Sequence, residues 1–436
     1  MTESSAKATA STTAPVSSAT SSRPGSGRRG EAIHDFTAKL RQPALWSHVV
    51  DYVKWQRALR KARASGQPDP VIQDLVPLSI NLDLTTACNY ACDHCIDWDI
   101  LNQKVKHDDA VLRSQMRELA ARGMQSVILI GGGEPTLFPT FVDFVRFLKE
   151  DLRLQVSVVS NGSRNDKILE IAPYLTKGDW VRLSLDSGSN DVFQRMHNPS
   201  KKSLTLDEIC AWIPKIKRAN PAFQMGFSFV ITWQGAERDD TRVVENIQEI
   251  VEATKRARDA QFDYISFKPF LERAETGSEV MDPAHMEGEL KKVIARIRES
   301  VDAAKALETP TFRVLESTNL RMLLEQSWAD YTKQPRVCHM QALRQVVNPH
   351  GTFNCPAYRG VSYARVGGRD AYKDRSSVRE AVGTTTALLD NFDASVNCKE
   401  VTCLYNQVNW WLEELCSNDV DLDAMQIVSN GRDTFL

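Results

Sequence analysis

The stretch TTACNYACDHC at residues 85–95 carries three cysteines in the spacing C-x3-C-x2-C, namely Cys88, Cys92 and Cys95. Thiolates are soft ligands that select iron–sulfur clusters or zinc. A structural zinc site needs a fourth ligand close by, and His94, between two of the thiols, has to fold back within the same turn to supply it. Three thiols without a fourth suit a [4Fe–4S] cube that leaves one iron open for another ligand. The stretch therefore predicts an iron–sulfur site, with structural zinc as the alternative.

This stretch follows the first of six apolar runs that alternate with helical patterns between residues 77 and 310. The runs predict strands at residues 78–84, 126–130, 154–160, 180–186, 223–232 and 264–270. The patterns after them predict helices at residues 108–122, 141–149, 166–175, 206–217, 240–259 and 284–304. Repeated β–α units predict an α/β fold whose parallel sheet forms a closed or partial barrel. Because such barrels carry their chemistry on loops after the carboxyl ends of strands, the cysteines lie where an active site is expected.

The segments on either side of this block differ from it in composition. Residues 1–33 are rich in Ser, Thr and Ala and predict a disordered tail, because they contain too little apolar surface to fold. In residues 34–76, Trp46 and Val49 belong to a helical repeat of apolar residues that predicts an arm packed on the main domain. The pattern then changes to short strands and Gly/Pro turns, so residues 311–436 predict a separate, smaller α+β domain.

Charge and composition exclude several classes of protein. Lys and Arg number 54 and Asp and Glu number 56, which gives a net charge of −2. Proteins that bind nucleic acid or anionic membranes usually carry a basic excess, and no apolar run approaches the roughly 18 residues of a membrane helix. The first residues lack the apolar core of a secretory signal, and nine cysteines, an odd number, argue against a disulfide framework. We expect a cytoplasmic protein with no nucleic-acid or membrane partner.

Glycine and short polar residues follow the next strands at the same predicted rim. The second strand ends in GGGEPT at residues 131–136, where glycine allows the backbone to approach a ligand closely. An isolated glycine triplet of this kind is more often a tight turn. The third strand ends in Ser160 and Asn161, and the fourth carries Ser184 and Asp186 on one face near its end. These motifs extend the predicted active site around the rim.

Lys268 lies at the end of the predicted sixth strand. A buried lysine is rare without a partner, so this residue either contacts the substrate or pairs with an acid. We include it with the three cysteines of residues 85–95 among the expected catalytic residues.

A second set of cysteines lies in the C-terminal part of the chain, at Cys338, Cys355, Cys398 and Cys403. Residues 344–348 and 352–354 predict a β-hairpin that brings the first two of these together. The last two precede an amphipathic helix expected at residues 405–415. Four converging thiols suit either structural zinc or a second iron–sulfur cluster. Cys210 and Cys416 lie in helical patterns and are expected to be ordinary buried thiols.

The cysteine spacing after the first strand resembles the signature of the radical S-adenosylmethionine (SAM) enzymes, and the resemblance extends from residue 77 to about residue 304. It implies a partial (β/α)6 barrel and a [4Fe–4S] cluster on the first three cysteines, with SAM chelated to the open iron. It further implies reductive cleavage of SAM to a 5′-deoxyadenosyl radical that abstracts a hydrogen atom from a substrate. An electron donor of the flavodoxin or ferredoxin type is the partner that this chemistry implies.

The same resemblance assigns contacts with SAM. The glycine turn looks like the family's GGE motif, whose backbone receives the SAM ammonium, and the acidic side chain of Glu134 also suits that cation. The end of the fourth strand looks like the segment that approaches the ribose and methionine parts of SAM. The SPASM/Twitch branch implies an arginine for the SAM carboxylate, which register places at Arg195, and His94 holds the place of an aromatic residue that contacts adenine. The expected SAM-contacting residues are His94, Gly132, Gly133, Glu134, Ser160, Asn161, Ser184, Asp186 and Arg195.

The C-terminal cysteines resemble those of a Twitch domain, which implies one auxiliary [4Fe–4S] cluster on Cys338, Cys355, Cys398 and Cys403. The spacing of the last pair departs from the family's pattern and Cys416 is left over, so the identity of the fourth ligand stays open. Cys210 or Cys416 could alternatively donate a hydrogen atom to a substrate radical.

The resemblance implies a radical SAM oxidoreductase acting on a small polar natural-product intermediate, such as a sugar or aminocyclitol, with the auxiliary cluster accepting an electron. Residues 34–76 are too few for the leader-binding domain that many peptide-modifying relatives carry, which favours a small molecule over a peptide. The alternatives are a peptide maturase, a redox-neutral epimerase, dehydratase or lyase, and a non-catalytic iron–sulfur or zinc scaffold.

Overall fold

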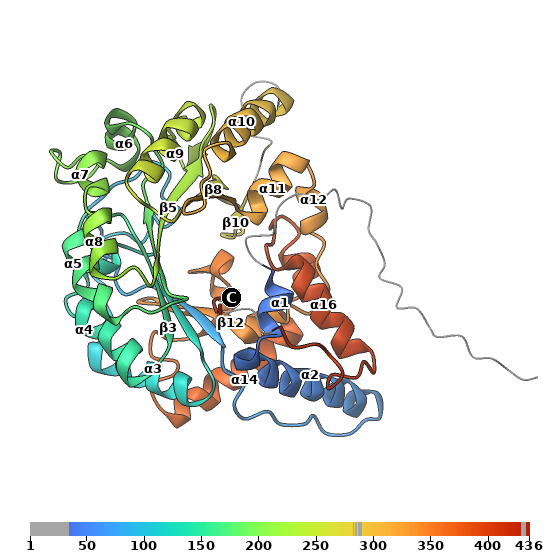
Figure 1. Cartoon of the computed structure of the whole chain (residues 1–436). Helices are drawn as coiled ribbons and strands as arrows, with labels where there is room; N and C mark the ends of the chain where they lie inside the picture. The colour runs from blue at the N-terminus through green and yellow to red at the C-terminus, as the bar shows by residue number, and fades with distance from the viewer. Residues whose placement is uncertain (1–34, 282, 284–285, 287–289, 429–432) are drawn as a thin grey trace, which may run out of the picture. The chain divides into compact units, whose positions relative to one another are not determined.

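The computed structural model describes residues 35–281, 283, 286, 290–428 and 433–436, and these residues belong to one compact unit (Figure 1). The predicted disordered tail at residues 1–33 lies outside the described residues. None of the described helices is long and apolar enough to cross a membrane.

A curved parallel sheet forms the centre of this unit. Its parallel strands are β1 (Ser79–Leu82), β2 (Ser126–Leu129), β3 (Gln155–Ser160), β4 (Trp180–Ser184), β5 (Gln224–Ile231), β8 (Tyr264–Pro269), β11 (Arg313–Glu316) and β12 (Arg344–Asn348). The sheet order is β11-β8-β5-β4-β3-β2-β1-β12-β13-β14. No ladder among the described residues joins the two ends of this order, so the predicted α/β partial barrel is confirmed.

Helices follow the strands and cover the outer side of the sheet (Figure 1). They are α3 (Asp109–Ala121), α4 (Phe141–Arg146), α5 (Asn165–Ile171), α6 (Asn190–His197), α7 (Leu206–Cys210), α8 (Ile213–Ala219), α9 (Ile250–Asp259) and α10 (Leu290–Lys305). In β4, Val181 and Leu183 are fully buried beneath these helices, whereas Arg182 and Ser184 face the inside of the barrel and are partly exposed. The inner face of the sheet is therefore the more polar one.

One predicted helix is shorter than its pattern suggested. The helix expected at residues 240–259 begins only at Ile250, because β6 (Glu237–Arg238) and β7 (Thr241–Arg242) pair as a small antiparallel hairpin. Asp239, in the turn of this hairpin, takes a left-handed backbone conformation with φ 54°, which aspartate tolerates better than most residues. This conformation is incompatible with a right-handed helix at that position. Further along the chain, the short strands β9 (Glu272–Arg273) and β10 (Glu279–Val280) form a second hairpin after β8.

The sheet continues past the boundary predicted at residue 310. Strand β11 pairs with β8, and β12 pairs in parallel with β1 before turning back through the predicted hairpin into β13 (Gly351–Phe353) and then β14 (Arg365–Gly367). The C-terminal helices are α11 (Thr318–Glu325), α12 (Trp328–Tyr331), α13 (Met340–Leu343), α14 (Arg375–Asn391), α15 (Ala394–Asn397) and α16 (Asn406–Ser417). The C-terminal residues thus share the barrel's sheet, and their identity as an auxiliary-cluster domain stays a prediction.

The N-terminal arm consists of α1 (Phe36–Leu40) and α2 (Pro43–Ala64), and Figure 1 shows α2 beside α16. Trp46 and Val49 of α2 are buried, as their helical spacing predicted, and Val53 one turn further on is fully buried as well. Arg60 of α2 forms a bidentate pair with Glu413 of α16 at 2.9 Å. The arm therefore packs on the C-terminal part of the chain.

Candidate active site

The loop after β1 carries the three predicted cluster ligands, Cys88, Cys92 and Cys95, as free and partly buried thiols. This loop lies against the glycine turn that follows β2. The Glu134 N–H donates to the carbonyl of Ala87 at 2.8 Å. A Cβ on Gly133 would lie 2.4 Å from the same carbonyl oxygen, so only glycine allows the two segments to approach this closely.

The carboxylate of Glu134 joins the glycine turn to the end of β3. One oxygen accepts from the hydroxyls of Thr136 and Ser160, and the other accepts from the Asn161 N–H at 2.7 Å. The side chain is only 2% exposed. The structure therefore brings five of the predicted SAM-contacting residues together, namely Gly132, Gly133, Glu134, Ser160 and Asn161. Both Glu134 oxygens accept hydrogen bonds within the protein and shape the turn, and the contact of this turn with the SAM ammonium stays a prediction.

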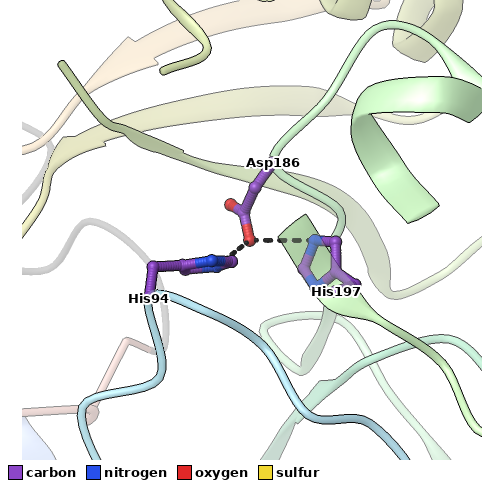
Figure 2. A group of neighbouring side chains, drawn as sticks. All are labelled: His94, Asp186 and His197. Carbon is purple, nitrogen blue, oxygen red and sulfur yellow. Dashed lines mark hydrogen bonds and ion pairs between the residues drawn. The ribbon is translucent and has the colours of Figure 1, made fainter. Parts of the chain in front are cut away.

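Asp186 lies at the centre of a charged group with His94 and His197 (Figure 2). One oxygen of Asp186 lies 3.1 Å from Nε2 of His94 and 3.3 Å from Nε2 of His197. The other oxygen accepts from the Val230 N–H at 2.6 Å. Asp186 has a left-handed backbone with φ 50°, which is uncommon outside glycine and tends to persist at functional sites. These contacts hold the turn after β4 in its strained conformation.

Both histidines connect this group to the cysteine loop. Nδ1 of His94 lies 2.8 Å from Asp93, and Nδ1 of His197 lies 3.2 Å from the Cys92 sulfur. Burial opposes the charged form of His94, but the carboxylates of Asp186 and Asp93 outweigh it and raise its pKa to about 9. His94, Asp186 and His197 are close enough to hold a metal ion. Both ring nitrogens of His94 lie within hydrogen-bonding distance of carboxylates, those of Asp93 and Asp186, which ties the cysteine loop to the turn after β4.

Arg195 lies away from this group. Its side chain is 54% exposed and pairs with Asp191, one turn earlier on α6, at 3.1 Å. Residues two apart on a helix point about 200° away from each other, and the buried face of α6 carries His197 instead. The structure therefore corrects the register argument that placed Arg195 at the site and brings His197 there.

Arg195 lies away from the site, and its exposed ion pair with Asp191 contributes little to stability. We therefore expect Arg195→Ala to change the affinity for SAM by less than about twofold. The measurement is equilibrium binding of SAM to the anaerobically reconstituted protein. Arg146→Ala is the matched control, since Arg146 is a half-exposed arginine paired with Asp143 on α4. A tenfold loss in Arg195→Ala alone would mean that this side chain leaves Asp191 to bind the SAM carboxylate.

The four predicted cysteines of the second set line one cavity, and they are Cys338, Cys355, Cys398 and Cys403. The Tyr358 hydroxyl lies 3.5 Å from the Cys398 sulfur at the cavity wall. Burial raises the pKa of the Cys338 thiol to about 12, and the neighbouring Cys355 adds to this effect. A metal bound here therefore has to displace thiol protons. Cys416 is buried on α16 and does not line the cavity, so the geometry favours Cys403 as the fourth member of the set.

Comparison with known families identifies the part of the chain that contains the first site. Residues 82–282 match the model of the Radical SAM superfamily. The chain carries a radical SAM domain. This family uses a [4Fe–4S] cluster and SAM, which are the cofactors predicted from the sequence.

Two curated relatives of the radical SAM domain are named S-adenosylmethionine-dependent nucleotide dehydratases. The protein from Thermoplasmatales archaeon (strain ISO4-H5) is 33% identical over 111 residues, which are 25% of this chain and 38% of that protein. The protein from Selenomonas ruminantium is 27% identical over 176 residues, which are 38% of this chain and 61% of that protein. The matches thus span less than two thirds of the length of either relative.

A solved structure shares the fold. The crystal structure of Streptococcus suis SuiB bound to S-adenosylmethionine covers 73% of this chain and 69% of its own, with a TM-score of 0.50 and 14% identity. At this level of identity the likeness concerns the fold alone.

A buried ion-pair network joins the radical SAM domain to the segment after Cys355. Arg359 is 6% exposed, and its guanidinium lies 3.0 Å from Asp97 and 3.1 Å from Asp83. Asp97 comes two residues after the last cysteine of the first loop and accepts from the Gly132 N–H at 3.1 Å. Arg359 therefore fixes both the cysteine loop and the glycine turn. No local sequence pattern marks Arg359, because its partners lie far away along the chain.

Removing Arg359 leaves two buried carboxylates without their cation, so we expect Arg359→Met to lower the free energy of unfolding by about 3–5 kcal/mol. Burial raises the pKa of Asp83 to about 8 even with Arg359 beside it, so this carboxyl can be held as the neutral acid, which favours the lower end of the range. The measurement is urea unfolding of reconstituted protein. Arg164→Met removes an exposed pair with Asp166 and should cost less than about 1 kcal/mol. Equal losses in the two variants would contradict the structural role of Arg359.

Proposed function

We propose that the chain is a radical SAM enzyme that holds a [4Fe–4S] cluster on Cys88, Cys92 and Cys95. The observation that carries this proposal is the set of three free thiols, without a fourth cysteine in their loop, at the carboxyl end of β1 in a radical SAM domain. Such a cluster, with SAM on its open iron, supplies the electron that yields methionine and a 5′-deoxyadenosyl radical able to remove a hydrogen atom from substrate.

In this proposal the protein's own residues position the cofactors. The glycine turn presents backbone groups beside the cysteine loop, and Glu134 holds the shape of that turn. His197 lies against the Cys92 sulfur while Asp186 orients its ring. Hydrogen bonds to cluster sulfurs shift the reduction potential, so His197 is placed to influence how readily the cluster accepts an electron.

We further propose that the second cysteine set holds an auxiliary [4Fe–4S] cluster. The convergence of its four thiols on one cavity supports this assignment. Four protein thiolates leave no iron open for substrate, so the proposed role is to accept an electron when a substrate radical is oxidised. A protein of the flavodoxin or ferredoxin type is the proposed donor for the first cluster.

The proposed substrate is a small polar molecule of the sugar or aminocyclitol kind, which the enzyme oxidises. The names of the two curated relatives favour a second candidate, a redox-neutral dehydration of a nucleotide. In that case the substrate loses water with no net oxidation, and the second cysteine set has no electron to accept from the substrate.

The proposal is tested by the cleavage of SAM. Anaerobically reconstituted protein, given SAM and a strong reductant such as dithionite, should form 5′-deoxyadenosine and methionine in equal amounts, as measured by chromatography. Omitting the reductant should stop the reaction. Protein with a full iron content that forms no 5′-deoxyadenosine under these conditions would contradict the proposed activity.

A further inference from the structure

Three serines lie in register across β4, β5 and β8. Ser184 pairs with Ser228, and Ser228 pairs with Ser266. Paired residues in a sheet point to the same face, and the opposite face carries Leu183 and Phe227, which are fully buried beneath the helices. The three hydroxyls therefore face the inside of the barrel. The Ser266 hydroxyl has no hydrogen-bond partner among the described residues.

A cation lies at each end of this row of hydroxyls. Arg182 comes two residues before Ser184, and Lys268 comes two residues after Ser266, so both share the inner face. The levels of the two cations differ by four strand residues, or about 13 Å of backbone. We refer to Arg182, Ser184, Ser228, Ser266 and Lys268 as the lumen row.

Within the described part of the chain, neither cation of the lumen row forms an ion pair or hydrogen bond with a carboxylate. Arg182 stacks on the ring of Trp180 at 5.0 Å and its Nε has no acceptor, and no hydrogen bond or ion pair joins Lys268 to any described residue. Asp186 is near, but its oxygens are engaged by two histidines and the Val230 N–H. Burial and the charge of Arg182 together lower the pKa of Lys268 to about 7, although the carboxylate of Asp186 acts in the opposite direction. A partly buried cation without a carboxylate partner is costly to keep, so this pair favours a ligand with negative charge.

Aromatic side chains close the barrel below the lumen row. A Cβ on Gly226 would lie 2.3 Å from the ring of Tyr264, so the missing side chain lets this ring lie across β5. Trp180 packs on Phe435 with ring centroids 5.6 Å apart. At the other end of the row, Lys268 stays partly exposed, near the turn that carries Asp186. A ligand on the lumen row therefore extends from an aromatic floor toward the proposed SAM site.

We propose that the lumen row binds the phosphate groups of a phosphorylated substrate inside the barrel. Two cations separated by a row of hydroxyl donors suit a chain of phosphates better than a single carboxylate, because donors along the whole row then find acceptors. The word nucleotide in the names of both curated relatives agrees with this chemistry. The inference rests on the proposed function, since a substrate held here has to meet the radical.

The test uses the anaerobically reconstituted holoenzyme with SAM present. Calorimetric titrations compare ATP, GTP, CTP and UTP with their nucleosides and with citrate. We expect at least one triphosphate to bind at least 10-fold more tightly than its nucleoside. Lys268→Gln and Arg182→Gln should each weaken that binding by about 10- to 100-fold, as expected for the loss of a charge-assisted hydrogen bond. Lys268→Arg keeps the charge and should retain most of the affinity for the triphosphate. Retained affinity would also show that the site tolerates substitution at this position.

Lys201→Gln is the matched control, because Lys201 is an exposed lysine outside the barrel. Binding of no triphosphate by the parent, or equal affinity in all variants, would overturn the proposal. Binding of citrate alone would overturn the assignment to phosphate. A loss of SAM affinity in Lys268→Gln as large as its loss of nucleotide affinity would assign the lysine to SAM instead. The parent's own 5′-deoxyadenosine formation without nucleotide tests the proposed function separately, so the two failures can be distinguished.

Discussion

Replacing Cys88, Cys92 and Cys95 together by Ala is expected to abolish the formation of 5′-deoxyadenosine from SAM. The physical reason is that the three thiols are the ligands proposed to leave one iron open for SAM, and no other cysteine lies in their loop. Cleavage of the sulfonium needs a cluster near the low end of the range of about −700 to +450 mV that proteins reach. Without a cluster in this loop, no such electron reaches SAM. The measurement is 5′-deoxyadenosine by chromatography after anaerobic reconstitution and reduction.

The control for this variant is Cys210→Ala, which removes a buried thiol of α7. It should keep the parent's rate of SAM cleavage, because Cys210 lies in a separate helix and is not a proposed ligand. Undiminished 5′-deoxyadenosine formation in the triple variant would exclude the first cysteine set as the site of SAM cleavage. Loss of SAM cleavage in Cys210→Ala, with SAM cleavage intact in the triple variant, would mean that the cluster ligands have been assigned to the wrong cysteines.

The sequence sufficed for those features that depend on neighbouring residues. The six predicted strands lie where apolar runs predicted them, since the face buried beneath the helices leaves a strong local signal. The position of the cysteine loop directly after β1 could be predicted because the two are neighbours in the sequence. The hairpin β12–β13 could be predicted from its turn residues. These features place the site on the partial barrel without any knowledge of distant contacts.

Contacts between segments that are distant in the chain could not be predicted from the sequence. That β12 adds to the edge of β1 depends on pairing between residues more than 250 positions apart, such as Ser79 and Arg344. The position of Arg359 between Asp83 and Asp97 has the same origin. Arg195 lies on the exposed face of α6, and the local spacing did not reveal which face of this helix is buried.

The network of Arg359 gives the two cysteine sets a physical connection. Arg359 follows Cys355 of the second set by four residues and pairs with Asp97, which follows Cys95 of the first set by two. This buried guanidinium therefore links the Cys355 segment to the first loop within a closely packed interior. Occupancy of the second set by a metal is therefore expected to affect the geometry of the radical SAM site, even though no thiol is shared.

The iron content of the second cysteine set is the last expected result. If Cys338, Cys355, Cys398 and Cys403 hold a [4Fe–4S] cluster, the parent should contain about 8 irons per chain and the triple variant of the first set about 4. Cys403→Ala should lose the second cluster, whereas Cys416→Ala should keep it, because Cys403 lines the shared cavity and Cys416 does not. Iron and zinc are measured together by plasma mass spectrometry. About 4 irons and one zinc in the parent would assign zinc to the second set and remove its role as electron acceptor, and loss of the metal in Cys416→Ala alone would refute the choice of Cys403.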